Sequence, residues 1–295
     1  MFGDGFSVGL FFPIVTGNEA IPTMNNQVSL ARQAESLGFD ALWFRDVPLY
    51  SPTFGDAGQI YDPWVYLAHV GAQTEEIALT TGSIVLPLRH PLHVAKAAAS
   101  VDVLTDGRLV LGVASGDRPE EFPAFGVRRD PTFLFRESVR LLRECWSEEY
   151  PSVESAFGDL DGSLEILPKP TTDTLPLLVT GHAGQSLEWI ADHGDGWVYY
   201  QRSLADVESQ LATWRDLAGP DKPYVQVLHI DLLENREAEG HPIHQGFAGG
   251  ADWFREHIHG LRAAGVDHVM INIRKSSRDP AVVLDEFAET VLESL

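Results

Sequence analysis

Cysteine, lysine and long apolar runs are scarce in this chain. Its 295 residues contain one cysteine, Cys145, so no internal disulfide can form. No run of about 18 apolar residues occurs, which argues against a transmembrane helix. The N-terminus leads from Met1 into an apolar segment at Phe6 without a basic leader, which disfavours a signal peptide. We therefore expect a cytoplasmic protein with no membrane partner.

Acidic residues outnumber basic ones. The chain has 21 Lys and Arg against 43 Asp and Glu, and its formal net charge is −22. The electrostatic field of so negative a chain repels polyanions, so nucleic acid is not an expected partner. Hydrophobic residues make up 44% of the chain, which predicts a folded protein instead of a disordered one. We expect a single domain over residues 1–295.

Several common catalytic and metal-binding signatures are also missing. The chain has neither a G-x-x-x-x-G-K-[ST] phosphate loop nor a G-x-G-x-x-G dinucleotide motif. Residues 112–116 read G-V-A-S-G, one position away from the nucleophile elbow of hydrolases. The pair His241 and His244 has no nearby carboxylate or cysteine at zinc spacing, and His257 and His259, two residues apart in a helical pattern, point to different faces. We therefore predict no metal site.

Eight short apolar runs recur along the chain, most of them separated by helical patterns. They read as continuous hydrophobic segments, which is typical of parallel strands buried on both faces. Eight alternations in 295 residues favour a single (β/α)8 TIM barrel with extended loops over the rival, a doubly wound open sheet. The predicted strands are Phe6–Phe12, Ala41–Phe44, Ile77–Leu86, Leu109–Ala114, Leu175–Thr180, Gly196–Tyr200, Tyr224–Leu233 and His268–Ile273.

Local signals mark the ends of the predicted helices. Asp62-Pro63 and Asp279-Pro280 each place an N-cap residue before a proline at the first helical position. Gly38 and Gly265 each follow a helical pattern and precede an apolar residue, an aspartate and a strand. This joint predicts a left-handed C-cap at both glycines. A long loop from Asp46 to Tyr61 leaves the second strand, so it should lie at the face where barrel active sites are found.

Small residues follow the predicted fourth and fifth strands. Ser115 and Gly116 end the fourth, and Gly181-His182-Ala183-Gly184-Gln185-Ser186 links the fifth to a helix. Free N–H groups before a helix favour a bound anion such as a ligand phosphate. A plain glycine turn with a serine cap would explain the same residues. Arg118 and Arg136 could add positive charge there, or could be surface arginines.

Four stretches, in this order and spacing, resemble the bacterial luciferase-like monooxygenases, a flavin- and deazaflavin-dependent barrel family. They are residues 38–43 (G-F-D-A-L-W), 84–91 (I-V-L-P-L-R-H-P), 107–112 (G-R-L-V-L-G) and 191–197 (A-D-H-G-D-G-W). The resemblance implies a (β/α)8 barrel with flavin across the strand ends, supported by a cis peptide bond matching Gly82–Ser83. It also implies a phosphate site at Gly181, His182, Ala183, Gly184 and Ser186, with Ser115. We add Gly116 and Arg118 to the cofactor-binding set because they adjoin Ser115.

The chain departs from the family at its acid–base residue. Luciferases carry a catalytic histidine after the second strand, following an acidic residue. Here the acidic residue is Asp46 and Val47 follows it, so that histidine is missing. Asp46 and His90 are our candidate catalytic residues, and Arg45 is a further one, because all three lie near strand ends. An ion pair or a helix cap would equally explain each of them.

The resemblance leads to three hypotheses. The first is a two-component monooxygenase that uses reduced FMN, supplied by a separate flavin reductase, and O2 on a small organic substrate. There, the loop Val47–Gln59, with Tyr50 and Phe54, would exclude water. The second is hydride transfer with deazaflavin F420, whose longer anionic tail would need more basic residues. The third is a flavin-binding protein without turnover, and a barrel lyase or isomerase is a weaker rival. Family analogy also suggests a homodimer.

Overall fold

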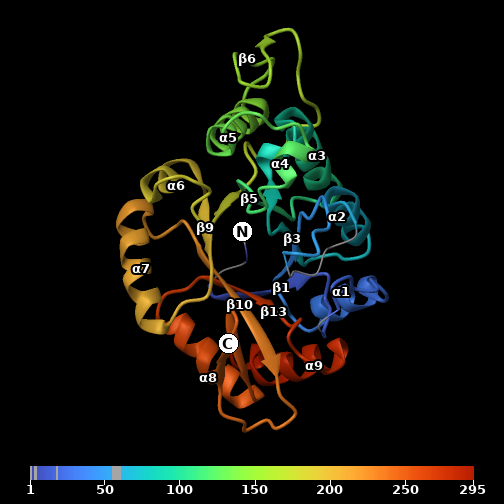
Figure 1. The fold of residues 1–295 in the computed structure, drawn as a ribbon, viewed down its shortest axis with the longest axis vertical. Helices are drawn as coiled ribbons and strands as arrows, with labels where there is room; N and C mark the ends of the chain where they lie inside the picture. Colours follow the sequence, from blue (N-terminus) through green and yellow to red (C-terminus); the bar gives the residue numbers. More distant parts are fainter. Residues whose placement is uncertain (1, 3–4, 18, 55–60) are drawn as a thin grey trace.

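The computed structural model describes residue 2 and residues 5–17, 19–54 and 61–295. Within them, eight parallel strands close into a barrel surrounded by helices, as Figure 1 shows. Each strand pairs with the next, and the last, β13, pairs with both β10 and β1, which closes the barrel. The predicted (β/α)8 fold is therefore confirmed. The barrel strands are β1 (Ser7–Phe12), β2 (Ala41–Phe44), β3 (Ala78–Thr81), β5 (Leu109–Ala114), β8 (Leu177–Thr180), β9 (Gly196–Tyr199), β10 (Tyr224–Leu232) and β13 (His268–Asn272).

Helices follow the strands and pack around the outside of the barrel. Proline stands at the first position of four of them, where its missing N–H costs no hydrogen bond. The predicted caps are confirmed, because the side chains of Asp62 and Asp279 accept hydrogen bonds from the first turns that follow. The helices are α1 (Gln27–Ser36), α2 (Pro63–Gly71), α3 (Pro91–Leu104), α4 (Glu121–Ala124), α5 (Pro131–Ser147), α6 (Leu187–His193), α7 (Leu204–Ala218), α8 (Ala251–Ala263) and α9 (Pro280–Thr290), with short 3-10 turns at Leu86–Leu88 and Leu292–Ser294.

Three aspartates accept hydrogen bonds from backbone amides at the beginnings of barrel strands. Gly38 and Gly265 adopt left-handed φ values of 85° and 95° after α1 and α8, as predicted. The aspartate two residues further on turns back to a neighbouring strand: Asp40 accepts a hydrogen bond from the amide of Val8, and Asp267 from that of Tyr224. Asp195 does the same for the amide of Leu177. These carboxylates thus organise the face opposite the strand ends.

The side chains form two hydrophobic clusters, one inside the barrel and one between the barrel and its helices. The floor of the barrel is closed by Trp43 and His268. The indole Nε1 of Trp43 donates to Nε2 of His268 at 3.0 Å, Ser7 bonds the other ring nitrogen at 2.7 Å, and Phe2 stacks on the imidazole. His268 is fully buried, and this burial lowers its pKa to about 3. A neutral imidazole therefore belongs to the core.

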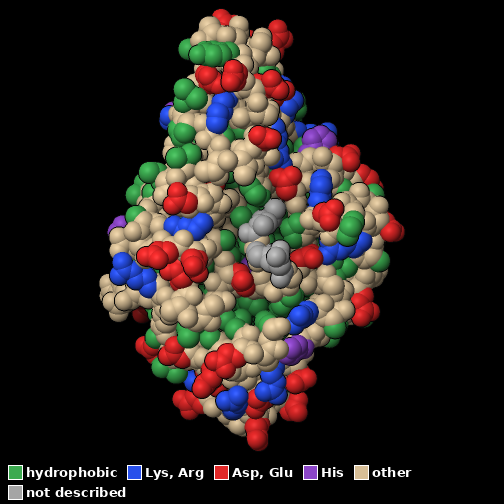
Figure 2. Space-filling view, turned by 180° about the vertical axis from the view of Figure 1, so that it is seen from behind, with side chains coloured by type: hydrophobic (Ala, Val, Ile, Leu, Met, Phe, Trp, Pro, Cys, Tyr) green, Lys and Arg blue, Asp and Glu red, His purple; other side chains and the backbone are tan. Residues whose placement is uncertain are grey.

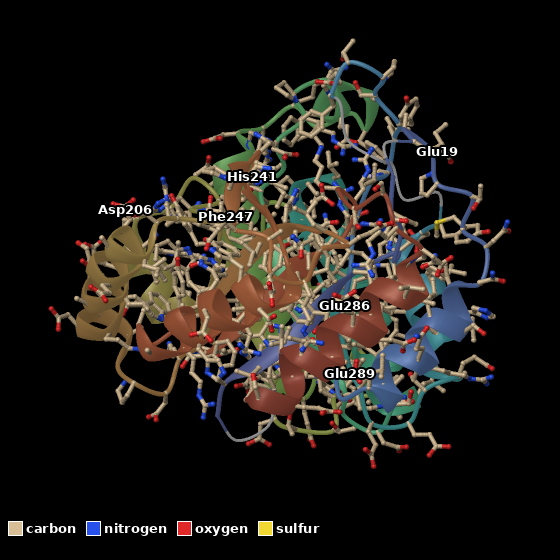
Figure 3. The ribbon with its side chains drawn as sticks, turned by 90° about the horizontal axis from the view of Figure 1, so that it is seen from below. Glu19, Asp206, His241, Phe247, Glu286 and Glu289 are labelled. Carbon is tan, nitrogen blue, oxygen red and sulfur yellow. The ribbon has the colours of Figure 1, made fainter. Side chains whose placement is uncertain are left out.

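Two strand pairs extend the structure beyond the barrel. The first is a hairpin of β6 (Ser152–Val153) and β7 (Leu160–Asp161), which projects beside α5 in Figure 1. The second, which we call the arm, consists of β11 (His241–Ile243) and β12 (Gly246–Gly249). Strand β12 pairs with the C-terminal half of β10. Figure 3 shows His241 and Phe247 on the arm, above α9 with Glu286 and Glu289. A further strand, β4 (Ile84–Val85), pairs with β5.

The acidic surface is mixed with basic side chains. In the view of Figure 2, Asp and Glu lie interspersed with Arg and Lys around a middle region where hydrophobic side chains show. This arrangement fits a solvated surface better than a docking site of one sign. Among the described residues, no helix combines the length and the apolar character needed to cross a membrane.

Candidate functional site

The ends of β3, β5 and β8 meet at one edge of the barrel. Val113 on β5 pairs with Val179 on β8, so the chains that continue from them bring Ser115 beside Gly181. The hydroxyl groups of Ser83 and Thr180 are hydrogen-bonded to each other across this edge. The structure therefore brings together three of the segments that the sequence nominated for cofactor binding.

Close packing of the backbone explains the glycines at this edge. The Gly82–Ser83 peptide bond is cis, as the resemblance implied. A Cβ built on Gly112 would lie 1.9 Å from the carbonyl oxygen of Thr81. Gly116 has a φ of 91°, and a Cβ there would lie 2.9 Å from a methyl group of Val85. Glycine at these positions lets the strand ends approach without a side chain between them.

The loop after β8 presents backbone amides. Gly181, Ala183 and Gly184 all have positive φ values, of 60°, 47° and 71°. Among the described residues, no hydrogen bond uses the amides of His182, Ala183 or Gly184. Ser186 then caps α6 by accepting a hydrogen bond from the amide of Trp189 at 3.3 Å. Successive amides in such a turn form a concave surface suited to an anion.

Arg136 supplies positive charge beside this loop. It extends from α5, and its Nε donates to the side-chain oxygen of Gln185. The amide nitrogen of Gln185 in turn donates to the carbonyl oxygens of Ala183 at 3.0 Å and Thr132 at 3.2 Å. The guanidinium also lies 5.7 Å from the ring centre of Trp189. Buried Gln185 therefore ties α5, the loop and Arg136 into one unit.

Arg118, which the sequence placed in the cofactor site, contacts the loop after β2. Its Nη1 donates to the carbonyl oxygen of Leu49 at 3.1 Å, and the guanidinium lies 4.4 Å from the ring centre of Phe54. Glu121 lies 3.7 Å away, and burial raises the pKa of its carboxyl group. Arg118 thus contacts the predicted covering loop at Leu49 and at Phe54. Residues 55–59 of that loop lie outside the described residues.

Asp46 is a buried anchor. One of its carboxylate oxygens accepts hydrogen bonds from the amide of Val85 at 3.1 Å and from Nε of Arg89 at 2.9 Å, and the other accepts from Nη2 of Arg89 at 2.8 Å. Arg89 also contacts Asp62 at 3.2 Å. The carboxylate therefore joins the ends of β2 and β4 to the start of α2. It borders a cavity of about 500 Å³, which is also lined by Tyr50.

The side chains of His90 and His182 are both engaged with other groups of the protein. His90 is the N-cap of α3: it accepts a hydrogen bond from the amide of Leu92, and its other ring nitrogen lies 3.3 Å from the carbonyl oxygen of Phe157. The ring of His182 lies 5.7 Å from that of Trp197, which belongs to the outer hydrophobic cluster. A catalytic role for His90 or Asp46 stays a prediction.

Sequence reasoning missed a polar group on the opposite side of the barrel mouth. Every second residue of β10 faces the barrel interior, as Val225 and Val227 of the inner cluster do. By the same period, His229 and Asp231 lie on the inner side of the strand. Asn272 on β13 pairs with His229. Arg45 at the end of β2 lies over the ring of Phe11. A two-residue period within the run Tyr224–Leu233 was the signal that could have found His229.

The fold and these strand-end residues define an α/β barrel whose fifth strand is followed by a loop with three backbone amides that bond to no described residue. The model of the luciferase-like monooxygenase family matches residues 6–268, and the chain belongs to this family. The family contains flavin- and F420-dependent oxidoreductases, and this chain is an enzyme of that type. Among the described residues, no group of three or more His, Cys, Asp or Glu could hold a metal ion.

Curated relatives include two F420-dependent dehydrogenases. An F420-dependent hydroxymycolic acid dehydrogenase of Mycobacterium tuberculosis is 31% identical over 70% of this chain and 58% of its own length. An F420-dependent glucose-6-phosphate dehydrogenase of Kineococcus radiotolerans is 30% identical over 61% of this chain and 53% of its own. An uncharacterized protein of Mycobacterium tuberculosis is 33% identical over 70% of this chain and 80% of its own.

Solved structures share the fold across the whole chain. The monooxygenase RslO1 from Streptomyces bottropensis has a TM-score of 0.81 at 22% identity and covers 98% of this chain and 99% of its own. An F420-dependent secondary alcohol dehydrogenase has a TM-score of 0.79 at 18% identity and covers 98% of both chains. At these identities the likeness establishes the barrel fold and nothing finer.

Proposed function

We propose that this protein is an F420-dependent oxidoreductase that oxidises a hydroxyl-bearing small molecule by hydride transfer. The observation that carries the proposal is the similarity, at 30% identity or more, to two relatives named as F420-dependent dehydrogenases. This similarity favours F420 over FMN as the cofactor. The small number of basic residues had favoured FMN. We also propose a single domain; a homodimer and a cytoplasmic location stay predictions.

The residues at the strand ends suit a phosphorylated tricyclic cofactor. The amides of His182, Ala183 and Gly184 and the guanidinium of Arg136 would bind its phosphate, aided by Ser115 and Ser186 on either side. Gly82, Ser83 and Gly116 would lie under or beside the ring system. When bound, the deazaflavin supplies a carbon that accepts a hydride from the substrate.

Exclusion of water would fall to the loop after β2. Arg118 donates a hydrogen bond to the carbonyl oxygen of Leu49 and stacks on the ring of Phe54. Asp46 accepts a hydrogen bond from the amide of Val85, which lies just after the cis peptide bond. In this proposal Arg118 and Asp46 position the walls of the site, since their polar atoms already bond to the protein. A closed, rigid wall keeps the substrate oriented toward the acceptor carbon.

The second candidate is the FMN- and O2-dependent monooxygenase with a separate flavin reductase. The charge balance of the chain favours it, because 21 basic residues against 43 acidic ones leave few partners for the longer F420 tail. A flavin-binding protein without turnover is the remaining alternative.

The test is an anaerobic assay with oxidised F420 and a panel of alcohols that includes 2-propanol, a long-chain secondary alcohol and glucose 6-phosphate. We expect at least one alcohol to bleach the visible absorbance of the oxidised deazaflavin. A matched assay supplies FMN, a flavin reductase, NADH and O2. Substrate-dependent product formation only in the second assay would overturn the F420 proposal in favour of the monooxygenase.

A further inference from the structure

We infer that the cavity beside Asp46 receives the apolar body of the substrate, so that the substrate is an uncharged alcohol with a long hydrocarbon chain and not a sugar phosphate. The inference rests on the proposed function, because it assumes that an alcohol is oxidised at the strand ends. In that step the substrate C–H bond breaks, and its electron pair goes with the hydrogen to oxidised F420. The hydroxyl proton passes to water, and the substrate leaves as a carbonyl compound.

The cavity lies where the covering loop leaves the second barrel strand. Asp46, the second residue after β2, forms part of its wall. The same carboxylate accepts a hydrogen bond from the amide of Val85, two residues beyond the cis peptide bond of Gly82 and Ser83. The cavity therefore adjoins the strand end at which we propose that the ring system of the cofactor lies. A chain held in the cavity can present its hydroxyl-bearing carbon at that end.

Apolar side chains from separate segments form most of the wall. Ile21 comes from the segment between β1 and α1, Val47 and Pro48 from the covering loop, Leu88 from the 3-10 turn, and Phe125 from the end of α4. Small-molecule sites are typically concave and lined mainly by apolar side chains from several elements. The wall thus suits a hydrocarbon chain, which needs no hydrogen-bond partner.

Several large side chains of this wall are open to solvent in the absence of a ligand. Ile21 is 52% exposed, Tyr50 and Tyr61 are each 47% exposed, and Phe125 is 46% exposed. Single exposed apolar residues are ordinary, but these four line one cavity. Apolar surface that is gathered in this way marks a site of interaction. A hydrocarbon chain in the cavity would remove it from water.

The charges in the cavity disfavour a phosphorylated substrate. Among the described residues that line it, Arg89 is the one with a basic side chain. Its guanidinium donates to the two carboxylate oxygens of Asp46 at 2.9 and 2.8 Å and lies 3.2 Å from the carboxylate of Asp62, which also lines the cavity. Two carboxylates against one guanidinium leave one negative charge unmatched. A phosphate group would be repelled there, whereas an uncharged alcohol would not.

The volume of the cavity limits the length of the chain. The cavity measures about 500 Å³, which is within the range of roughly 300–1,000 Å³ that small-molecule sites occupy. At about 30 Å³ for each water-sized group, it holds on the order of 15 non-hydrogen atoms. We therefore expect affinity to rise with chain length until the cavity is filled, and then to level off.

The first experiment measures binding without the cofactor. Isothermal titration calorimetry compares 2-pentanone, 2-heptanone, 2-nonanone and 2-undecanone, which are the products of the matching alcohols, on the F420-free protein. Each methylene group that becomes buried should tighten binding by up to about fourfold. Glucose 6-phosphate, titrated in the same way, should not bind.

Two phenylalanines of equal exposure provide a variant and its control. Phe125 lines the cavity and is 46% exposed, whereas Phe133 on α5 is 45% exposed and does not line it. In Phe125→Ala the dissociation constant of 2-undecanone should rise by roughly fivefold, because part of the chain loses its apolar neighbour. In Phe133→Ala it should stay within about twofold of the wild-type value. The F420 dissociation constants of the three proteins should agree within about twofold, which shows that the cofactor site is intact in each.

Turnover then separates the inference from the proposed function. Anaerobic F420 reduction is followed with 2-propanol, 2-undecanol and glucose 6-phosphate, and kcat/KM should be at least about tenfold higher for 2-undecanol than for 2-propanol. Phe125→Ala should narrow that ratio through KM.

Three results would show that the inference is wrong: ketone affinity that does not depend on chain length, equal losses in Phe125→Ala and Phe133→Ala, or a preference for glucose 6-phosphate. In each case, F420 reduction by any member of the panel would still support the proposed function. If the ketones bind as expected but no alcohol reduces F420, the proposed function is overturned. The assignment of the cavity ligand as a substrate is then overturned with it.

Discussion

The buried pair of Asp46 and Arg89 offers a sharp test of whether Asp46 anchors the site or performs chemistry. The Asp46 side chain is fully buried and the Arg89 side chain is 22% exposed. In Asp46→Ala, the guanidinium loses two charge-assisted hydrogen bonds and the amide of Val85 loses its acceptor. Breaking one partner of a buried pair costs about 3–5 kcal/mol. We expect the lower end, because Asp62 still contacts Arg89.

Thermal unfolding converts this cost into a shift that is easily measured. Globular proteins have an unfolding entropy of roughly 2.1 cal/mol/K per residue, so 295 residues give about 0.6 kcal/mol per kelvin. A loss of about 3 kcal/mol should therefore lower the Tm by about 5 °C. Circular dichroism melts of Asp46→Ala, Arg89→Met and the double variant would measure it. The double variant should lose less than the sum of the single variants by about 1 kcal/mol or more, because no charge is left unpaired.

Asp62→Asn is the control for this cycle. Its carboxylate is 44% exposed at 3.2 Å from Arg89, and asparagine can still cap α2 through its side-chain oxygen, so only the exposed ion pair is lost, at a cost of about 1 kcal/mol or less. An unchanged Tm in Asp46→Ala, together with a kcat lowered by roughly 10²-fold or more, would refute the anchor and restore Asp46 as an acid or base.

Three other predictions follow from groups elsewhere in the barrel. The pKa of His268 is about 3 in the folded protein and about 6.5 in an unfolded chain, so the unfolded state binds more protons between these values. The free energy of unfolding, measured in urea, should therefore decrease as the pH is lowered from about 6.5 toward 3, and His268→Gln should reduce that slope. Gly184→Ala introduces a Cβ 2.5 Å from Oγ1 of Thr132 at a φ of 71°, so F420 affinity in a titration should fall by roughly tenfold; unchanged affinity would contradict the loop assignment. Cys145 is fully buried and burial raises the pKa of its thiol, so a thiol reagent should label it only after denaturation, and rapid labelling of the native protein would disprove this burial.

The architecture could be predicted because its signals are local. Each barrel strand is a short run buried on both faces, and the helix exits at Gly38 and Gly265 are marked by glycine followed by an apolar residue. The helix starts at Asp62 and Asp279 are set by the cap and the proline beside it. Signals of this kind span four to six residues and survive in a single sequence.

The roles of the site residues depended on contacts between distant segments. Asp46 meets Arg89, 43 residues away, and Arg118 meets Leu49, 69 residues away. No spacing rule connects such pairs. His229 escapes prediction for another reason: the run Tyr224–Leu233 is apolar enough to predict a strand buried on both faces, whereas every second residue of β10 faces the barrel interior. Applying the two-residue period to each predicted strand would have placed it at the mouth.

The most direct test of the account is a side-by-side titration of the purified protein with F420 and with FMN, followed by absorbance and fluorescence. The account predicts saturable binding of F420 that is tighter than that of FMN, and that is weakened by Arg136→Met through the loss of a phosphate contact. Tighter binding of FMN would contradict the F420 assignment. Binding of neither cofactor would contradict the assignment of the strand ends as a cofactor site.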